Sequence, residues 1–198
     1  MAKLKTKTAY LCSACGDDFA KWNGQCPSCK EWGTLSQFKI SAKKNGRKHE
    51  PRETKSLMEV LTTNSSERIP TGLQEADRVL GGGLLSGSLI LLGGSPGVGK
   101  STLALHICSG INRKSLYISA EESEEQVAIR ARRLNVSPEH LFLSGENELD
   151  GIISHIDRLQ PELVVVDSIQ TVMNSGLDSL PGSPSQIRDC GQRLLEVS

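Results

Sequence analysis

The sequence predicts an α/β fold with a largely parallel sheet, preceded by a small cysteine-rich unit. From Ile69 onward, short apolar runs alternate with amphipathic helical segments. A glycine-rich loop at 94–101 lies between one such run and a helical segment, and four cysteines near the start form two Cys-x-x-Cys pairs. Strands that alternate with helices imply right-handed crossovers and helices on both faces of the sheet.

The expected elements of this core follow the hydrophobic pattern. Residues 88–93 predict a buried strand that leads into the glycine-rich loop, and residues 100–111 predict the helix after it. Ser123 and Gln126 have the spacing of a capping box at the start of another helix. The remaining expectations are strands at 116–119, 141–143 and 163–166 and helices at about 150–159 and 186–197.

Three segments are expected along the chain. A four-cysteine unit spans 8–36, a basic polar linker spans 37–66, and the α/β core spans 67–198. In the linker, only the apolar residues between 57 and 61 suggest a short helical turn. The core stops before the further strands that such a sheet normally contains, so we expect it to be incomplete at its C-terminus.

Charge is distributed unevenly along the chain. Residues 1–55 hold 12 Lys and Arg against 5 Asp and Glu, about +7, whereas residues 56–198 hold 11 against 18, about −7. Such a basic arm either attracts nucleic acid through its phosphates or is simply a solvated segment. No apolar run approaches the roughly 18 residues of a membrane span, and no signal peptide is present, so we expect a cytoplasmic protein.

The loop at 94–101 has the pattern and the context of a phosphate-binding P-loop. Its glycines permit close approach of backbone N–H groups to an anion at a helix N-terminus. Lys100 is expected to reach the β and γ phosphates of ATP, and the Ser101 hydroxyl is expected to coordinate Mg²⁺. The expected nucleotide-binding residues here are Gly94, Ser95, Pro96, Gly97, Val98, Gly99, Lys100, Ser101 and Thr102.

Two further strands end in carboxylates that belong to the same chemistry. Asp167 ends the strand at 163–166 and is expected to bind Mg²⁺ as a Walker B residue. Glu121 and Glu122 follow the strand at 116–119, where a carboxylate can orient the water that attacks the γ-phosphate. The residues alone do not decide between these two glutamates.

The cysteine pairs predict a structural zinc site. Cys12, Cys15, Cys26 and Cys29 supply four thiolates in two knuckles, which suits one tetrahedral Zn²⁺ with no open position. An iron–sulfur centre and redox cysteines are less favoured alternatives. Nearby, Lys21, Trp22, Lys30 and Trp32 either stack on and pair with a nucleic-acid strand or, for the tryptophans, pack the knuckles.

Taken together, these motifs resemble the bacterial RadA (Sms) family of DNA-repair proteins, RecA-like ATPases with an N-terminal zinc finger. The resemblance is carried by the four cysteines, the P-loop and several shorter segments. These segments are residues 21–24, 69–72, 77–83, 117–123, 130–134 and 166–171. The resemblance implies a RecA-like fold, and it favours Glu121 over Glu122 as the catalytic glutamate beside Lys100.

The resemblance also implies a function and partners. Members of the family are DNA-dependent ATPases that process recombination intermediates and promote branch migration, usually as hexameric rings, with single-stranded or branched DNA as the ligand. Recombinases and replication-fork proteins are the implied protein partners, and ATP, Mg²⁺ and Zn²⁺ the implied cofactors. Because the family's later motifs are absent, the alternative is a non-hydrolysing fragment that binds zinc and ATP and acts only as an interaction module. A small-molecule kinase would not explain the zinc unit.

Overall fold

The computed structural model describes residues 7–40, 54, 56–59, 68–137, 139–177 and 179–198. The chain divides into two compact units, Met1–Ser66 with Ser183–Ser185, and Glu67–Gly182 with Gln186–Ser198. Most of the expected linker, including residues 41–53 of its basic stretch, lies outside the described residues. Of the helical turn expected between 57 and 61, residues 57–59 are described and are helical.

The first unit contains a small antiparallel sheet of order β2-β1-β3. Its strands are β1 (Lys7–Cys12), β2 (Asp18–Phe19) and β3 (Leu35–Ile40). The buried cluster of this unit consists of Cys12, Cys26 and Leu35, with four partly buried side chains around it. Since two of the three buried residues are cysteines, this unit has little apolar core of its own to stabilise it.

The second unit is built on a parallel sheet of order β7-β6-β8, which confirms the α/β prediction. Its strands are β6 (Ser115–Ser119), β7 (Leu141–Ser144) and β8 (Leu163–Asp167). All five residues of the central strand β6 are buried. In the register of the sheet, Ser119 lies beside Asp167, so the ends of β6 and β8 meet at the same edge.

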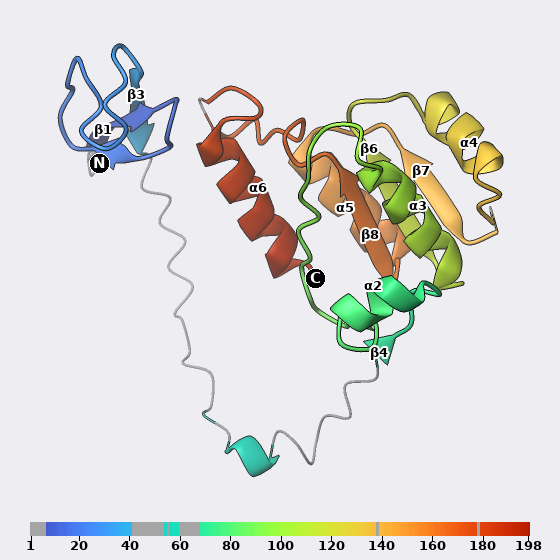
Figure 1. The fold of residues 1–198 in the computed structure, drawn as a ribbon. Helices are drawn as coiled ribbons and strands as arrows, with labels where there is room; N and C mark the ends of the chain where they lie inside the picture. The colour runs from blue at the N-terminus through green and yellow to red at the C-terminus, as the bar shows by residue number, and fades with distance from the viewer. Residues whose placement is uncertain (1–6, 41–53, 55, 60–67, 138, 178) are drawn as a thin grey trace. The chain divides into compact units, whose positions relative to one another are not determined.

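Helices cover both faces of this sheet (Figure 1). These are α3 (Lys100–Gly110), α4 (Glu124–Arg133), α5 (Leu149–Leu159) and α6 (Pro184–Glu196). Alternate strand residues face opposite sides: Tyr117 packs with Leu105 and Val127 of α3 and α4, whereas Ile118 packs with Ile152 of α5 and Leu194 of α6. Of the helices in the described ranges, none has the length and apolar character to cross a bilayer.

The helix boundaries confirm most of the expectations drawn from the sequence. The predicted helix at 100–111 is α3, and the predicted helix at 150–159 is α5. The capping box is formed, because the Ser123 side chain accepts from the Gln126 N–H and the Gln126 side chain accepts from the Ser123 N–H. Helix α6 begins two residues earlier than predicted, at Pro184, whose fixed φ suits a first helical turn.

A short segment before the P-loop was not foreseen as regular structure. Strand β4 (Arg68–Ile69) pairs with β5 (Leu84–Leu85), and helix α2 (Gln74–Val79) lies between them in the chain. The link is fixed by Thr71, whose N–H and hydroxyl both donate to Oδ1 of Asp77 at 2.8 Å. These bonds anchor the start of the unit.

The strand predicted at 88–93 is wrong. These residues form no strand, and they are exposed, with Leu89 at 54% and Leu91 at 84% of full exposure. A strand needs hydrogen bonds to a neighbouring strand. Within the described ranges, no strand pairs with residues 88–93, and β8 pairs with β6 alone. The apolar run therefore has the composition of a buried strand without a partner that would make it one.

Candidate nucleotide and metal sites

The P-loop joins the unpaired run at 88–93 to the first turn of α3. Gly97 and Gly99 have φ values of 78° and 99°, and Gly99 is the N-cap residue of the helix. A side chain at these two positions would be strained, which explains why the loop needs glycine there. The Lys100 ammonium folds back over the loop and donates to the carbonyl oxygens of Gly94 at 2.9 Å and Ser95 at 3.0 Å.

This loop fits a polyphosphate. The exposed residues from Gly94 to Gly99 lead into the open first turn of α3, whose N–H groups have no partner within the helix. The first turn contains no acidic residue that would repel an anion. Ser101 and Thr102 follow Lys100 and are half-buried on that turn. Lys100 would exchange its bonds to loop carbonyls for bonds to phosphate oxygens.

The carboxylate of Asp167 is held from the neighbouring strand. The Tyr117 hydroxyl donates to Oδ2 of Asp167 at 2.5 Å, and the tyrosine ring is fully buried. Burial, together with the hydrogen bond and the negative charge of Asp167, raises the pKa of Tyr117, so the hydroxyl remains a donor. Hydrogen bonding with the Ser101 side chain acts in the opposite direction on this pKa. The Tyr117 hydroxyl thus holds one oxygen of the Asp167 carboxylate.

The two glutamates after β6 have different surroundings. Glu122 forms an ion pair with Arg130 of α4, so its charge is compensated. Glu121 is exposed, and its Oε1 accepts a hydrogen bond from the hydroxyl of Ser168, the residue directly after Asp167. Only Glu121 of this pair is therefore linked to the end of β8. No local pattern in the sequence indicates Ser168 or Tyr117 as partners, because each bond joins residues about 50 positions apart.

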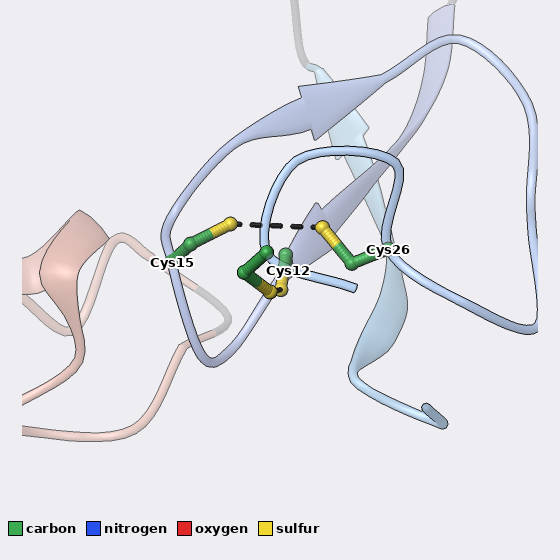
Figure 2. Close-up of side chains that lie close together, drawn as sticks. Cys12, Cys15 and Cys26 are labelled. Carbon is green, nitrogen blue, oxygen red and sulfur yellow. Dashed lines mark hydrogen bonds between the residues drawn. The ribbon is translucent and has the colours of Figure 1, made fainter. Parts of the chain in front are cut away.

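The four cysteines lie together in the first unit, as Figure 2 shows for Cys12, Cys15 and Cys26. The four Sγ atoms lie within 4.8 Å of one another. Cys12 and Cys29 have Sγ atoms 3.7 Å apart, and those of Cys15 and Cys26 are 3.6 Å apart. Tetrahedral ligands at a Zn–S distance of about 2.3 Å would be about 3.8 Å apart, so this arrangement fits zinc.

Each cysteine pair lies on its own turn, and the two turns have the same hydrogen-bond pattern. The N–H of Gly16 donates to the Cys12 carbonyl at 2.9 Å, and the N–H of Lys30 donates to the Cys26 carbonyl at 3.0 Å. Gly16 and Lys30 both have positive φ, 77° and 64°. Against the effect of burial, hydrogen bonds from Thr34 and from backbone N–H groups lower the pKa of Cys12 to about 6. A thiolate there is the form that binds metal.

The two tryptophans lie at the surface of the first unit. Trp22 is 60% exposed and Trp32 is 73% exposed, and neither belongs to the buried cluster around the cysteines. Both rings approach Gly24: a Cβ atom at this glycine would lie 3.5 Å from Trp32 and 3.8 Å from Trp22. We call Trp22, Gly24 and Trp32 the indole surface. Two exposed lysines are close to this surface in the sequence: Lys21 directly precedes Trp22, and Lys30 is two residues before Trp32.

Comparison with known families agrees with both parts of this architecture. Residues 69–148 match the KaiC family of ATPases, and residues 10–37 match a rubredoxin-type metal-binding domain. The second unit is therefore similar to P-loop ATPases of the KaiC family, and the four-cysteine unit is similar to a rubredoxin-type metal-binding domain.

Over almost its whole length, the chain is similar to RadA DNA repair proteins of several bacteria, which confirms the resemblance seen in the sequence. The chain is 40% identical to the "DNA repair protein RadA" of Listeria monocytogenes over 100% of its own length and 45% of that protein. The corresponding protein of Haemophilus influenzae is 41% identical, over 98% of this chain and 44% of its own length. That of Aquifex aeolicus is 42% identical, over 97% and 44%. The chain spans less than half the length of these relatives.

Proposed function

We propose that this chain binds and hydrolyses ATP with Mg²⁺, in a DNA-dependent manner, as part of recombinational DNA repair. The observation that carries the proposal is the hydrogen bond from Ser168 to Glu121, which links an exposed glutamate to the residue after Asp167, the proposed Walker B carboxylate. Relatives named as DNA repair proteins support the process. By the same likeness, we propose that the DNA substrate is a recombination intermediate and that the ATPase promotes branch migration within a ring.

The proposed roles follow from the position of each group. Lys100 and the loop N–H groups bind the β and γ phosphates, and Ser101 and Asp167 would hold Mg²⁺, which supplies charge neutralisation when bound. Glu121 takes the proton of the attacking water, because its carboxylate forms no ion pair with a described residue and lies beside the end of β8, where Mg²⁺ would bind. Glu122 instead fixes α4 through Arg130.

A second candidate function is a non-hydrolysing module that binds zinc and ATP. The exposed, unpaired run at 88–93 favours it, because this run supports the P-loop and is not fixed in the sheet. The two candidates differ in turnover, not in binding. A test must therefore measure ATP binding and phosphate release on the same preparation.

We expect Glu121→Gln to lower phosphate release by about a hundredfold or more while ATP affinity stays within twofold, since loss of a general base costs roughly 10²–10⁴ in rate. Glu122→Gln is the matched control and is expected to keep turnover, because it removes only a partly exposed ion pair. Phosphate release is measured with Mg²⁺ and ATP, with and without single-stranded DNA. ATP binding without turnover in the unaltered chain would favour the non-hydrolysing module, and equal losses in both variants would remove the assignment of Glu121.

For DNA, we propose that the first unit supplies the binding surface. The loop at 174–185 contains no Lys or Arg. The side chain of Gln186, directly after the loop, bonds to the backbone of Asn174 and Ser179 and so holds the loop in place. Phosphate attraction must come from elsewhere, and the basic segment Lys39–Lys55 is mostly outside the described residues. The indole surface is described, and exposed aromatic rings beside lysines suit stacking with unpaired bases.

The tryptophan fluorescence of the chain can test this directly, because Trp22 and Trp32 are its only tryptophans. We expect oligothymidine to quench this fluorescence in a salt-sensitive manner. Replacing both tryptophans by alanine is expected to weaken binding about tenfold or more, measured by anisotropy of labelled DNA, since each stacked base contributes about 1–3 kcal/mol. Ile129→Ala, which removes an exposed apolar side chain from α4, serves as the control. Unchanged affinity in the double variant would exclude the indole surface.

A further inference from the structure

Tyr117 has a hydroxyl group that the packing of its ring does not require. The ring belongs to the buried cluster between β6 and the helices α3 and α4, together with Leu105 and Val127. Phenylalanine would fill this space equally well, because the apolar contacts involve the ring alone. A buried hydroxyl must find a hydrogen-bond partner, since leaving it unpaired costs about 1–3 kcal/mol. The partner therefore shows what the hydroxyl does.

That partner is Asp167, reached along the sheet. Tyr117 pairs with Val165 in the parallel register, and Asp167 is two residues further along β8, on the same face. The ring thus leans toward the carboxyl ends of the strands and places its hydroxyl 2.5 Å from Oδ2 of Asp167. Within the described ranges, Oδ1 of Asp167 has no hydrogen-bond donor, so it is the oxygen available to a cation.

Ser101 is the other side chain expected to hold Mg²⁺, and it comes from a separate element: Ser101 lies on the first turn of α3, and Asp167 ends β8. Of these two side chains, Asp167 is the one to which the Tyr117 hydroxyl donates. Groups that hold ligands in place before the cation arrives lower the cost of binding it.

We propose that Tyr117 is a positioning residue of the nucleotide site: its hydroxyl fixes the Asp167 carboxylate, with Oδ1 presented to the cation. This inference rests on the proposed ATP and Mg²⁺ binding and goes beyond it, because it gives a role to a residue outside the proposed phosphate-binding and metal-binding side chains. The effect is confined to the cation-dependent part of nucleotide affinity. The phosphate contacts of the loop and of Lys100 do not involve this hydroxyl.

The test is Tyr117→Phe in the full chain, with the slowly hydrolysed analogue AMP-PNP titrated by calorimetry over a series of Mg²⁺ concentrations and in EDTA. We expect the Mg²⁺ concentration for half-maximal affinity to rise about threefold to tenfold, while affinity in EDTA stays unchanged. Asp167→Asn is expected to raise it further. Ser115→Ala is the matched control: it removes another buried hydroxyl of β6, bonded to the Arg113 carbonyl, and is expected to leave the Mg²⁺ dependence unchanged.

The possible results separate the role of Tyr117 from the existence of the nucleotide site. If Asp167→Asn shifts the Mg²⁺ dependence and Tyr117→Phe does not, the role of Tyr117 is wrong while the proposed nucleotide site stands. A lower Mg²⁺ requirement in Tyr117→Phe would also overturn it, because the hydroxyl would then compete with the cation. Equal weakening with Mg²⁺ and in EDTA would assign Tyr117 to the fold alone. If the unaltered chain binds no nucleotide, the proposed function and this inference both fail.

Discussion

Lys100→Ala is expected to weaken ATP binding by about tenfold to a hundredfold. Charge-assisted hydrogen bonds contribute about 1.5–3 kcal/mol each, and every 1.4 kcal/mol is a factor of ten in affinity. In the structure the ammonium group lies over the loop, 2.9 Å and 3.0 Å from the carbonyl oxygens of Gly94 and Ser95. It is therefore already placed beside the N–H groups that would bind the phosphates, and alanine leaves no cation there.

Lys114→Ala is the control for this substitution. Lys114 also donates to a carbonyl oxygen, that of Leu159 at 3.2 Å, but it precedes β6 at the edge of the sheet opposite to Asp167. Calorimetry of ATP with Mg²⁺ should show a loss for Lys100→Ala and none for Lys114→Ala. Unchanged ATP affinity in Lys100→Ala would mean that the glycine-rich loop is a structural turn and not a phosphate site.

The sequence predicts well those elements whose signal is local. The apolar stripe of α5 and the cap of α4 by Ser123 and Gln126 depend on residues within a few positions of one another. Residues 163–166 are consistently apolar because both faces of β8 are covered, and they were predicted as a strand. Helix α2 was missed because none of its residues is buried, so it has no apolar stripe that a periodicity could reveal.

The wrong strand prediction at 88–93 shows that amino-acid composition alone does not determine whether a segment forms a strand. An apolar run favours a strand, but the free energy of a strand comes from pairing with a neighbour. Leu91 is as apolar as any residue of β8, yet it is 84% exposed because no described strand lies beside it. The pattern describes what a segment would form when paired, and the structure decides whether it is paired.

Some contacts of the candidate site join residues far apart in the sequence, so no local sequence pattern predicts them. Glu121 and Glu122 are adjacent, and only the folded chain gives one of them Ser168 and the other Arg130. In the same way, Tyr117 is indistinguishable in sequence from any other aromatic residue of a buried strand. The parallel register of β6 and β8 brings its hydroxyl to Asp167, 50 positions later.

The second large effect that we expect is loss of zinc and of folded structure in the four-cysteine unit when one of its cysteines is replaced. Cys12→Ser should remove the metal and unfold residues 7–40, while the ATPase unit remains folded. Metal binding supplies most of the folding free energy of such small units, and the buried cluster here consists of Cys12, Cys26 and Leu35 alone. Serine keeps the size of the side chain but is a poor zinc ligand. Against the effect of burial, hydrogen bonding with Thr34 and the backbone lowers the pKa of the Cys12 thiol, which favours the thiolate that serine lacks.

Cys190→Ser provides the control, because Cys190 is a buried free thiol of α6 that belongs to the core of the second unit. Metal analysis should find one zinc per chain in the unaltered protein and in Cys190→Ser, and none in Cys12→Ser. Tryptophan emission reports on unfolding of the first unit, since Trp22 and Trp32 both lie there, and ATP affinity reports on the second. Iron in place of zinc would contradict the choice of metal. Retention of zinc by Cys12→Ser would contradict a closed four-thiolate site, because a structural zinc with all four positions filled by cysteine tolerates the loss of none of them.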